Sequence, residues 1–247
     1  MSETKEIRAM VLAAGLGSRM SQGGEARPKP LVELGGAPLI KYSIAAARKA
    51  GFDEVVINLH HRADEVQGQI GAGRELGVRI NWLFEPEILG TGGGVKNANR
   101  VFPAQNWLIL NADSVTDLGL KSLLYFHKRY RPAATMVLTQ SRKKYNPVYT
   151  DSLGRVRRIG NFPETLKEEV TLSKFAFCGI QVVSGRLLDY LPEGFSRMIE
   201  DGYFRALEKG DAVLAHVFHG LWLTFDEPQS LSQAGEKYAA VLARLLR

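Results

Sequence analysis

Apolar runs typical of buried strands alternate with amphipathic segments of helical period, and this alternation restricts the fold more than any other feature. The runs are apolar on both faces, as strands covered on two sides require. The predicted strands are 7–13, 54–59, 79–84, 106–112 and 134–140, and the predicted helices between them are 38–51, 63–71, 92–102 and 120–130. This alternation of strands and helices predicts an α/β fold with a doubly wound, mostly parallel sheet flanked by helices.

The pattern changes after residue 140 and predicts a mixed rather than purely parallel sheet. A hairpin is expected over 147–160, with its turn at Asp151 to Gly154. Further strands are predicted at 174–183, 212–218 and 221–225, and further helices at 185–190, 197–209 and 229–246. No linker, repeat or low-complexity segment interrupts the chain. We therefore expect one domain over residues 1–247.

Composition narrows the class of protein. Hydrophobic residues make up 45% of the chain and charged residues 23%, which is ordinary for a globular protein. The single cysteine, Cys178, allows no internal disulfide, and its apolar neighbours favour a buried hydrophobic role over a catalytic thiol. No run approaches the ~20 apolar residues of a membrane span, and the N-terminus lacks a signal peptide pattern. These features predict a cytoplasmic protein without membrane contact.

The charge balance is basic, with a formal net charge of +6. The basic residues are scattered apart from two short clusters at 142–145 and 155–158, so a nucleic-acid-binding arm is not expected. No motif of stacking aromatic residues supports RNA binding either. A basic protein of this kind is well suited to phosphate-bearing small molecules.

The stretch "LAAGLGSRM" at 12–20 predicts a phosphate site. It follows the first strand, at the sheet edge where α/β folds bind ligands. Gly15 and Gly17 allow close approach of backbone N–H groups to a phosphate, and Arg19 adds a charge that can grip two oxygens. Met20 stands where a dinucleotide-binding fingerprint needs its third glycine, so that motif is excluded.

A second motif, "RPKPLVELGGAPLI" at 27–40, holds Lys29 between two prolines that restrict its backbone. Together the two motifs resemble the signature of the sugar-1-phosphate nucleotidyltransferases, or NDP-sugar pyrophosphorylases. The segments 85–98, 108–117 and 177–183 also resemble, in order, the family's base-reading, metal-binding and sugar-facing segments. "NLHH" and the stretch 191–207 are similar to the branch that acts on N-acetylmuramate, mannose and heptose 1-phosphates.

The resemblance implies a Rossmann-like nucleotidyltransferase fold and an enzyme that needs Mg²⁺. Such an enzyme transfers a nucleotidyl group from a nucleoside triphosphate to a sugar 1-phosphate, giving an NDP-sugar for cell-wall or polysaccharide synthesis and pyrophosphate. It also implies a nucleotide-binding portion over about 1–140 and a sugar-binding portion over about 141–247. The base, the sugar and the oligomeric state stay open.

The resemblance also assigns roles to individual residues. Arg19 and Lys29 would be catalytic, Asp113 would bind Mg²⁺, and Gly179 would face the sugar. The expected nucleotide-binding residues are Leu12, Ala13, Ala14, Gly15, Gly17, Thr91, Gly92 and Ala112.

Several of these residues have simpler readings. Asp113 or, better placed, Asp117 could cap the helix near 118–130. The run Gly92–Gly94 could be only a helix-start turn, although Thr91 and Gly92 could equally offer N–H groups to a base edge. His60 and His61 lack a third metal ligand at suitable spacing and are expected at the sheet edge near the sugar pocket.

One motif departs from the family. Relatives carry a second metal-binding aspartate in a Trp-x-Asp-x-Gly-Thr-Pro pattern, and in "WLTFDEPQSL" Thr224 stands in its place. Asp226, two residues further on, is predicted to replace it as the second Mg²⁺ ligand, because i and i+2 side chains share one face of a strand. The alternative is an impaired homologue that binds a nucleotide or sugar phosphate in a regulatory role.

Overall fold

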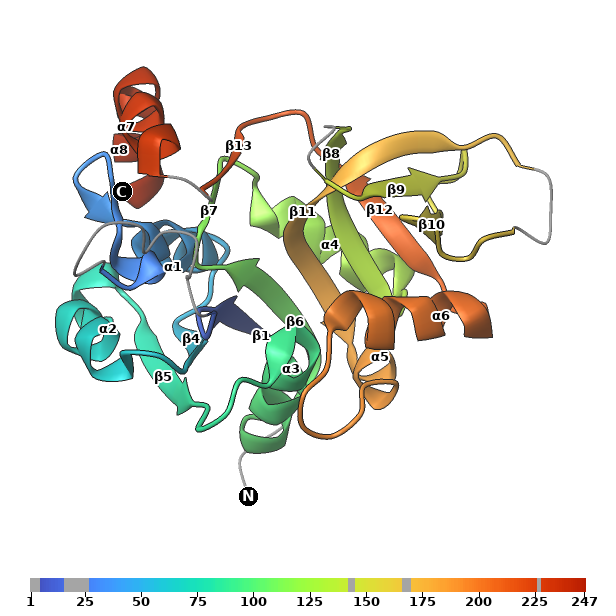
Figure 1. Cartoon of the computed structure of the whole chain (residues 1–247), viewed down its shortest axis with the longest axis horizontal. Coiled ribbons are helices and arrows are strands. Elements are labelled where there is room, and N and C mark those ends of the chain that lie inside the picture. The colour runs from blue at the N-terminus through green and yellow to red at the C-terminus, as the bar shows by residue number, and fades with distance from the viewer. Residues whose placement is uncertain (1–4, 16–26, 142–144, 166–169, 226–227) are drawn as a thin grey trace. The chain divides into compact units, whose positions relative to one another are not determined.

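The helices and strands divide between two compact units (Figure 1). The computed structural model describes residues 5–15, 27–141, 145–165, 170–225 and 228–247. The first unit comprises Met1–Ile7, Leu89–Ile109 and Lys121–His219, and the second comprises Arg8–Ile88, Leu110–Leu120 and Gly220–Arg247. Each unit thus gathers separate stretches of chain. The division into functional portions near residue 140 stays a prediction, because these units are defined by packing alone.

Three parallel strands form the sheet of the second unit. β4 (Glu54–Leu59) lies between β1 (Lys5–Leu12) and β5 (Arg79–Phe84) and pairs in parallel with both. Five consecutive residues of β4 are buried, as expected for a strand covered on both faces. Helices α1 (Leu39–Lys49) and α2 (Ala63–Ile70) occupy the connections. The predicted alternation of strands and helices is confirmed here.

Two short antiparallel strand pairs complete the second unit, and the sequence predicts only one of their four strands, β13 (Trp222–Thr224). β2 (Glu33–Leu34) pairs with β3 (Ala37–Pro38). β7 (Ser114–Thr116) pairs with β13, which lies within the predicted strand 221–225. Strands of two or three residues are too short to show a period of two in the sequence.

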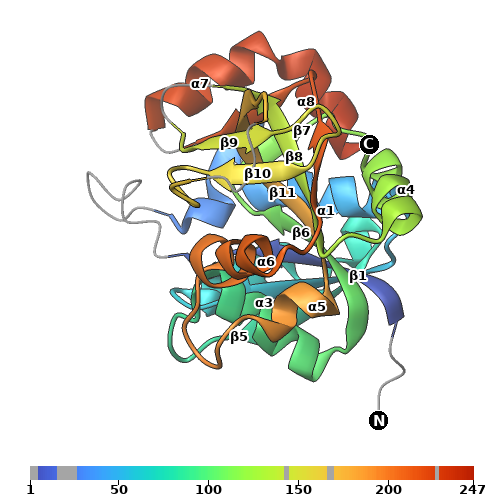
Figure 2. The same cartoon turned by 90° about the vertical axis from the view of Figure 1, so that its right-hand side faces the viewer.

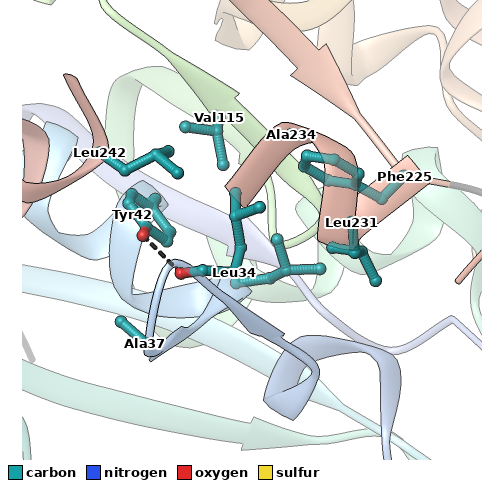
Figure 3. Packing of buried hydrophobic residues seen from close by; sticks show 9 residues of the cluster. Leu34, Ala37, Tyr42, Val115, Phe225, Leu231, Ala234 and Leu242 are labelled. Atoms are coloured by element: carbon teal, nitrogen blue, oxygen red, sulfur yellow. Dashed lines mark hydrogen bonds between the residues drawn. The ribbon is translucent and has the colours of Figure 1, made fainter. Parts of the chain in front are cut away.

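Helices α7 (Pro228–Lys237) and α8 (Ala239–Leu246) pack against both strand pairs through one buried apolar cluster. Figure 3 shows its side chains converging, with the Tyr42 hydroxyl donating to the Leu34 carbonyl at 2.7 Å. The cluster consists of Leu34, Ala37, Leu39, Tyr42, Val115, Phe225, Leu231, Ala234 and Leu242. The segment that follows Lys29 and the segment that follows Asp113 are therefore fixed by the same core.

The first unit contains a mixed sheet centred on β11 (Ser173–Ser184). β11 pairs antiparallel with β6, β8 and β9, while β10 pairs with β9 and β12 runs parallel to β8. Their bounds are Ala104–Asn111 for β6, Ala134–Gln140 for β8, Pro147–Thr150 for β9, Val156–Ile159 for β10 and Val213–Val217 for β12. β9 and β10 confirm the predicted hairpin.

Helices lie on both faces of this mixed sheet. α3 (Gly90–Val101), α5 (Gly185–Asp189) and α6 (Phe204–Lys209) lie together, and α4 (Leu120–Tyr130) lies on the other side (Figure 2). On the side of α6, the Tyr203 hydroxyl donates to the Gln181 side chain of β11. Gln181 and its neighbour Val182 point to opposite faces, because successive side chains alternate along a strand.

Two predicted helices differ in detail. The helix expected over 229–246 is two helices, since Tyr238 between α7 and α8 leaves helical geometry at φ −114° and ψ 17°. The helix expected over 197–209 begins as the π-helix η4 (Met198–Tyr203) before α6. Cys178 is buried in β11, which confirms the prediction for this residue. The described part of the chain contains no helix that is both long and apolar enough to cross a membrane.

A buried histidine makes the stability of the first unit depend on pH. His127 on α4 is 4% exposed, with Nδ1 2.9 Å from the Thr135 hydroxyl and Nε2 3.1 Å from Asn106 Oδ1. The amide oxygen can only accept, so the neutral ring donates from Nε2 and accepts at Nδ1. Burial lowers the pKa of His127 from 6.5 to about 4. The unfolded chain therefore binds this proton at higher pH than the folded chain.

We predict that His127→Gln reduces the loss of stability on acidification. In the wild type the unfolding free energy falls as the pH drops from 6.5 towards about 4, because protonation favours the unfolded state. Between pH 7 and pH 5 the histidine accounts for about 2 kcal/mol of that loss. Urea unfolding of both proteins at the two pH values measures the difference. Equal losses in wild type and variant would contradict the prediction.

Candidate active site

The chain leaves β1 through a segment held by hydrogen bonds on two sides. The Ala13 N–H donates to Asn58 Oδ1 at 2.9 Å, and the Ala112 N–H donates to the Leu12 carbonyl at 3.0 Å. Ala14 is buried, whereas Gly15 is exposed, and a Cβ added there would meet no atom of the described residues within 4 Å. The predicted nucleotide-binding segment thus emerges at the carboxyl edge of the parallel strands.

Two members of the predicted phosphate site, Gly17 and Arg19, lie outside the described residues. Their assigned roles stay predictions. The described part of the motif ends at Gly15, where the backbone has already left the sheet.

Lys29 and Asp113 meet although 84 positions separate them in the sequence. Lys29 Nζ lies 2.5 Å from Asp113 Oδ2, and their side chains are 18% and 28% exposed. Lys29 begins a single 3-10 turn, η2 (Lys29–Leu31), whose Pro30 and Leu31 are buried. That turn fixes the start of the lysine stem, as the two flanking prolines predict. The two charges predicted to act on phosphates and metal therefore lie in one place.

Asp113 is held by the structure around it rather than by capping a helix. It lies between the end of β6 and the start of β7. Ser43 on α1 donates to the Asn111 carbonyl at 2.8 Å, and its hydroxyl is 3.4 Å from the Ser114 carbonyl. One side chain thus holds the backbone on both sides of the aspartate. This fixed, partly exposed carboxylate suits a role in binding a cation.

The alternative that Asp117 caps the helix after it does not describe the bonds that this residue makes. Asp117 Oδ1 accepts the Leu221 N–H at 2.7 Å, and the Asp117 N–H donates to the Leu221 carbonyl at 3.2 Å. The helix α4 begins only at Leu120. Asp117 therefore ties the chain that precedes β13 to the end of β7. It helps to bring residue 224 beside the Asp113 segment.

Thr224 lies beside the Asp113 segment, where the family pattern expects the second aspartate. In the antiparallel pair of β7 and β13, Thr224 is opposite Ser114, the residue after Asp113. Asp226, the predicted second ligand, lies outside the described residues, so its role stays a prediction. Among the described residues, no group of three or more His, Cys, Asp and Glu side chains could hold a metal ion.

The glycine-rich start of α3, in the first unit, is packed against the chain around Ser196. The Gly92 N–H donates to the Ser196 carbonyl at 2.9 Å, and Thr91 Oγ1 accepts the Met198 N–H at 3.0 Å. A Cβ at Gly93 would lie 2.1 Å from the Gly194 carbonyl oxygen. The Gly92 N–H therefore already has a backbone partner, which agrees with the alternative of a helix-start turn. The nucleotide-binding role of Thr91 and Gly92 stays a prediction.

Gly179 has a structural reason of its own to be glycine. Its φ is +77°, in the left-handed region that side chains with a Cβ rarely adopt. The register between β11 and β8 shifts between Phe177 and Gln181, as in a β-bulge. Bulges redirect side chains and are frequent beside active sites. The sugar-facing role of Gly179 stays a prediction.

His60 lies directly after β4, as the expected place at the sheet edge requires. Its Nδ1 is 2.8 Å from the Glu85 carbonyl oxygen. Glu85 is itself 1% exposed, and its Oε1 accepts a hydrogen bond from Asn58 Nδ2 at 2.8 Å. Sequence reasoning singled out His60 but missed Asn58 and Glu85. The signal available was one amide in the otherwise apolar strand "VVINL".

Comparison with known proteins identifies the family. The family model described as "Nucleotidyl transferase" matches residues 8–241, which is nearly the whole chain. The chain belongs to the nucleotidyl transferase family.

Two curated relatives illustrate this membership. The chain is 28% identical over 203 residues to the UTP–glucose-1-phosphate uridylyltransferase of a Synechocystis strain, covering 76% of this chain and 52% of that protein. It is also 28% identical over 227 residues to the mannose-1-phosphate guanylyltransferase catalytic subunit beta of Drosophila melanogaster, covering 90% of this chain and 60% of that protein. The chain thus spans only about half to three-fifths of the length of these relatives.

Solved structures of similar fold cover almost the whole chain. HddC from Yersinia pseudotuberculosis has a TM-score of 0.76 at 20% identity, over 94% of this chain and 99% of that one. The inositol-1-phosphate CTP transferase from T. maritima has a TM-score of 0.75 at 16% identity, over 99% and 98%. At these identities the likeness concerns the fold. The predicted α/β nucleotidyltransferase fold, with a mixed, mostly parallel sheet flanked by helices, is confirmed.

We predict that Gly93→Ala destabilises the first unit, because the new methyl group would overlap the backbone of Gly194. Overpacking of this kind lowers the unfolding free energy by about 1–3 kcal/mol. Gly68→Ala on α2 is the matched control, since a Cβ there meets no atom of the described part of the chain within 4 Å. That substitution should raise stability by about 0.5–1 kcal/mol through helix propensity. Urea unfolding distinguishes them, and an equally stable Gly93→Ala protein would show the close packing to be dispensable.

Proposed function

We propose that the chain is a sugar-1-phosphate nucleotidyltransferase. The observation that carries the proposal is the Lys29–Asp113 pair, held beside the backbone segment that leaves β1 in a member of the nucleotidyl transferase family. The two curated relatives are named for the transfer of a uridylyl group to glucose 1-phosphate and of a guanylyl group to mannose 1-phosphate. The substrates would be a nucleoside triphosphate and a sugar 1-phosphate.

In the proposed reaction, a phosphate oxygen of the sugar 1-phosphate attacks the α-phosphorus of the nucleoside triphosphate. The bond from that phosphorus to the β-phosphate oxygen breaks, and pyrophosphate leaves with the electron pair. This reaction needs positioning and neutralisation of negative charge rather than a covalent intermediate on the protein. The Lys29 ammonium would stabilise charge at the reacting phosphate, and backbone N–H groups after Ala13 would bind the triphosphate.

The donor atoms around Asp113 fit Mg²⁺ as the cofactor. A carboxylate oxygen is a ligand that this hard cation prefers, and Asp113 is 28% exposed. With so few acidic side chains nearby in the described residues, phosphate oxygens of the substrate would supply further ligands. When bound, Mg²⁺ would neutralise charge on the phosphates. Asp113 would hold it, and Thr224 stands where relatives carry a second aspartate.

The position of Thr224 supports a second candidate function. Because Thr224 lies opposite Ser114, the site has a hydroxyl where a second carboxylate is expected. A protein of this kind could bind a nucleotide or a sugar phosphate without turning it over, and act in regulation. Pyrophosphate release, measured with a panel of nucleoside triphosphates and sugar 1-phosphates, separates the two functions. Binding of a nucleotide without any pyrophosphate release would favour the second.

We predict that Lys29→Met lowers turnover while the protein stays folded. Removing a preorganised charge from a phosphate site costs about 2–4 kcal/mol of transition-state stabilisation, roughly 30- to 1000-fold in rate. Lys209→Met, at an exposed position at the end of α6, is the matched control and should retain activity. Pyrophosphate release gives the rates, and circular dichroism checks folding. Near-normal turnover of Lys29→Met would remove Lys29 from the mechanism.

A pair of variants tests the second metal ligand. If Asp226 binds Mg²⁺, Asp226→Asn should lower activity and weaken its Mg²⁺ dependence, while Thr224→Asp gives little gain because three carboxylates would crowd one ion. If the site has instead lost catalysis, Thr224→Asp should raise activity by restoring the missing charge. Asp226→Asn would then have almost no effect. Titration of pyrophosphate release with Mg²⁺ distinguishes the patterns, and unchanged activity of Asp226→Asn would exclude Asp226 as a ligand.

A further inference from the structure

A buried amide joins the carboxyl ends of the three parallel strands in the second unit. Asn58 in β4 is 2% exposed and lies opposite Leu12 of β1 on one side and Leu83 of β5 on the other. Its side chain reaches just beyond both strands. Oδ1 accepts the Ala13 N–H at 2.9 Å, and Nδ2 donates to Glu85 Oε1 at 2.8 Å. An amide buried among apolar neighbours is stable only because both ends are hydrogen-bonded.

The carboxylate of Glu85 sets the orientation of this amide. A carboxylate only accepts hydrogen bonds, so it selects the NH₂ end of Asn58 and turns the oxygen towards Ala13. The bond is charge-assisted and therefore stronger than one between neutral groups. Glu85 is itself fixed, because its N–H donates to the Leu59 carbonyl at 2.8 Å and its carbonyl lies 2.8 Å from His60 Nδ1. The side chain and the backbone of Glu85 thus hold the end of β4 against the end of β5.

The Ala13 N–H is the first backbone group after the end of β1. Its hydrogen bond to Asn58, with the bond from the Ala112 N–H to the Leu12 carbonyl, fixes the direction in which the chain leaves the sheet. Ala14 and Gly15 follow immediately. A rotation of the peptide group at Ala13 would redirect the N–H groups after it, and these are the groups that would bind the triphosphate.

We propose that Asn58 and Glu85 are positioning residues that orient the phosphate-binding segment through Ala13. The proposal rests on the proposed nucleotide-binding function of that segment, and it concerns residues that need not touch the substrate. It follows that a substitution that breaks the hydrogen bond between Asn58 and Glu85 weakens the affinity for the nucleoside triphosphate strongly. The same substitution should change the KM for the sugar 1-phosphate far less. It also follows that the hydrogen-bond pattern matters, and not the identity of either residue alone.

The sharpest test exchanges the two side-chain types. Asn58→Asp places a carboxylate against the buried carboxylate of Glu85 and removes the donor between them. It should weaken nucleoside triphosphate binding roughly tenfold or more. Glu85→Gln keeps an acceptor and should bind within about threefold of the wild type. In the double variant Asn58→Asp/Glu85→Gln, the new carboxylate can accept both the Ala13 N–H and the new amide, so binding should recover.

Binding is measured by calorimetric titration with a nucleoside triphosphate alone, alongside the thermal midpoint of each protein. His127→Gln serves as the control for destabilisation, since His127 is a buried hydrogen-bonded residue of the other unit, and it should leave nucleotide affinity unchanged. If Asn58→Asp does not fold, Asn58→Ser replaces it, because a hydroxyl is too short to bridge both partners. This variant should also weaken binding.

Three results would overturn the proposal: wild-type affinity in the Asn58 variants, no recovery in the double variant, or a wild type that binds no nucleoside triphosphate. A failure of the proposed catalytic function is distinguishable from these results. In that case the wild type binds the nucleotide without releasing pyrophosphate, and the loss and recovery of binding among the variants still support the positioning role.

Discussion

The contact between Lys29 and Asp113 depends on apolar packing more than on the attraction between the two charges. A partly exposed ion pair of this kind contributes about 0–1 kcal/mol, too little to bring together segments 84 positions apart. Leu34 lies a few residues after Lys29 in the chain, and Val115 lies shortly after Asp113. Both belong to the buried cluster that α7 and α8 cover. Burial of large apolar side chains is worth about 1.5–3 kcal/mol each. The core therefore places the charges, and the charges remain available to a substrate.

The sequence predicted the regular part of this arrangement and missed the part made by short contacts. The strands β1, β4, β5, β6 and β8 have long apolar runs, so their existence and order could be read directly. Only the family resemblance indicated that Lys29 and Asp113 belong to one site. Hydrophobic periodicity does not encode a contact between residues 84 positions apart. The pairs β2–β3 and β7–β13 rest on two or three residues each, and the capping role expected of Asp117 gave way to its bonds with Leu221.

Glycines show most clearly why a motif does not settle a role. The sequence suggested that Gly92 offers its N–H to a base, whereas that N–H binds the Ser196 carbonyl and the adjacent glycines allow the chain around Gly194 to approach α3. Both readings require glycine for the same physical reason, the lack of a Cβ. They differ only in what approaches the backbone, a ligand or another part of the chain. That difference is a matter of tertiary packing, which a single sequence does not contain.

Thr224 makes the proposed site less negative by one charge than a second aspartate at this position would. Lys29 and Asp113 together are neutral, so a second carboxylate at position 224 would leave one negative charge to hold a divalent cation before any nucleotide binds. With threonine there, the described side chains offer the cation a single carboxylate already paired with an ammonium. The phosphate oxygens of the triphosphate would then provide most of the attraction for Mg²⁺. Under the proposed function the metal would therefore enter together with the nucleotide, unless Asp226 restores the missing charge.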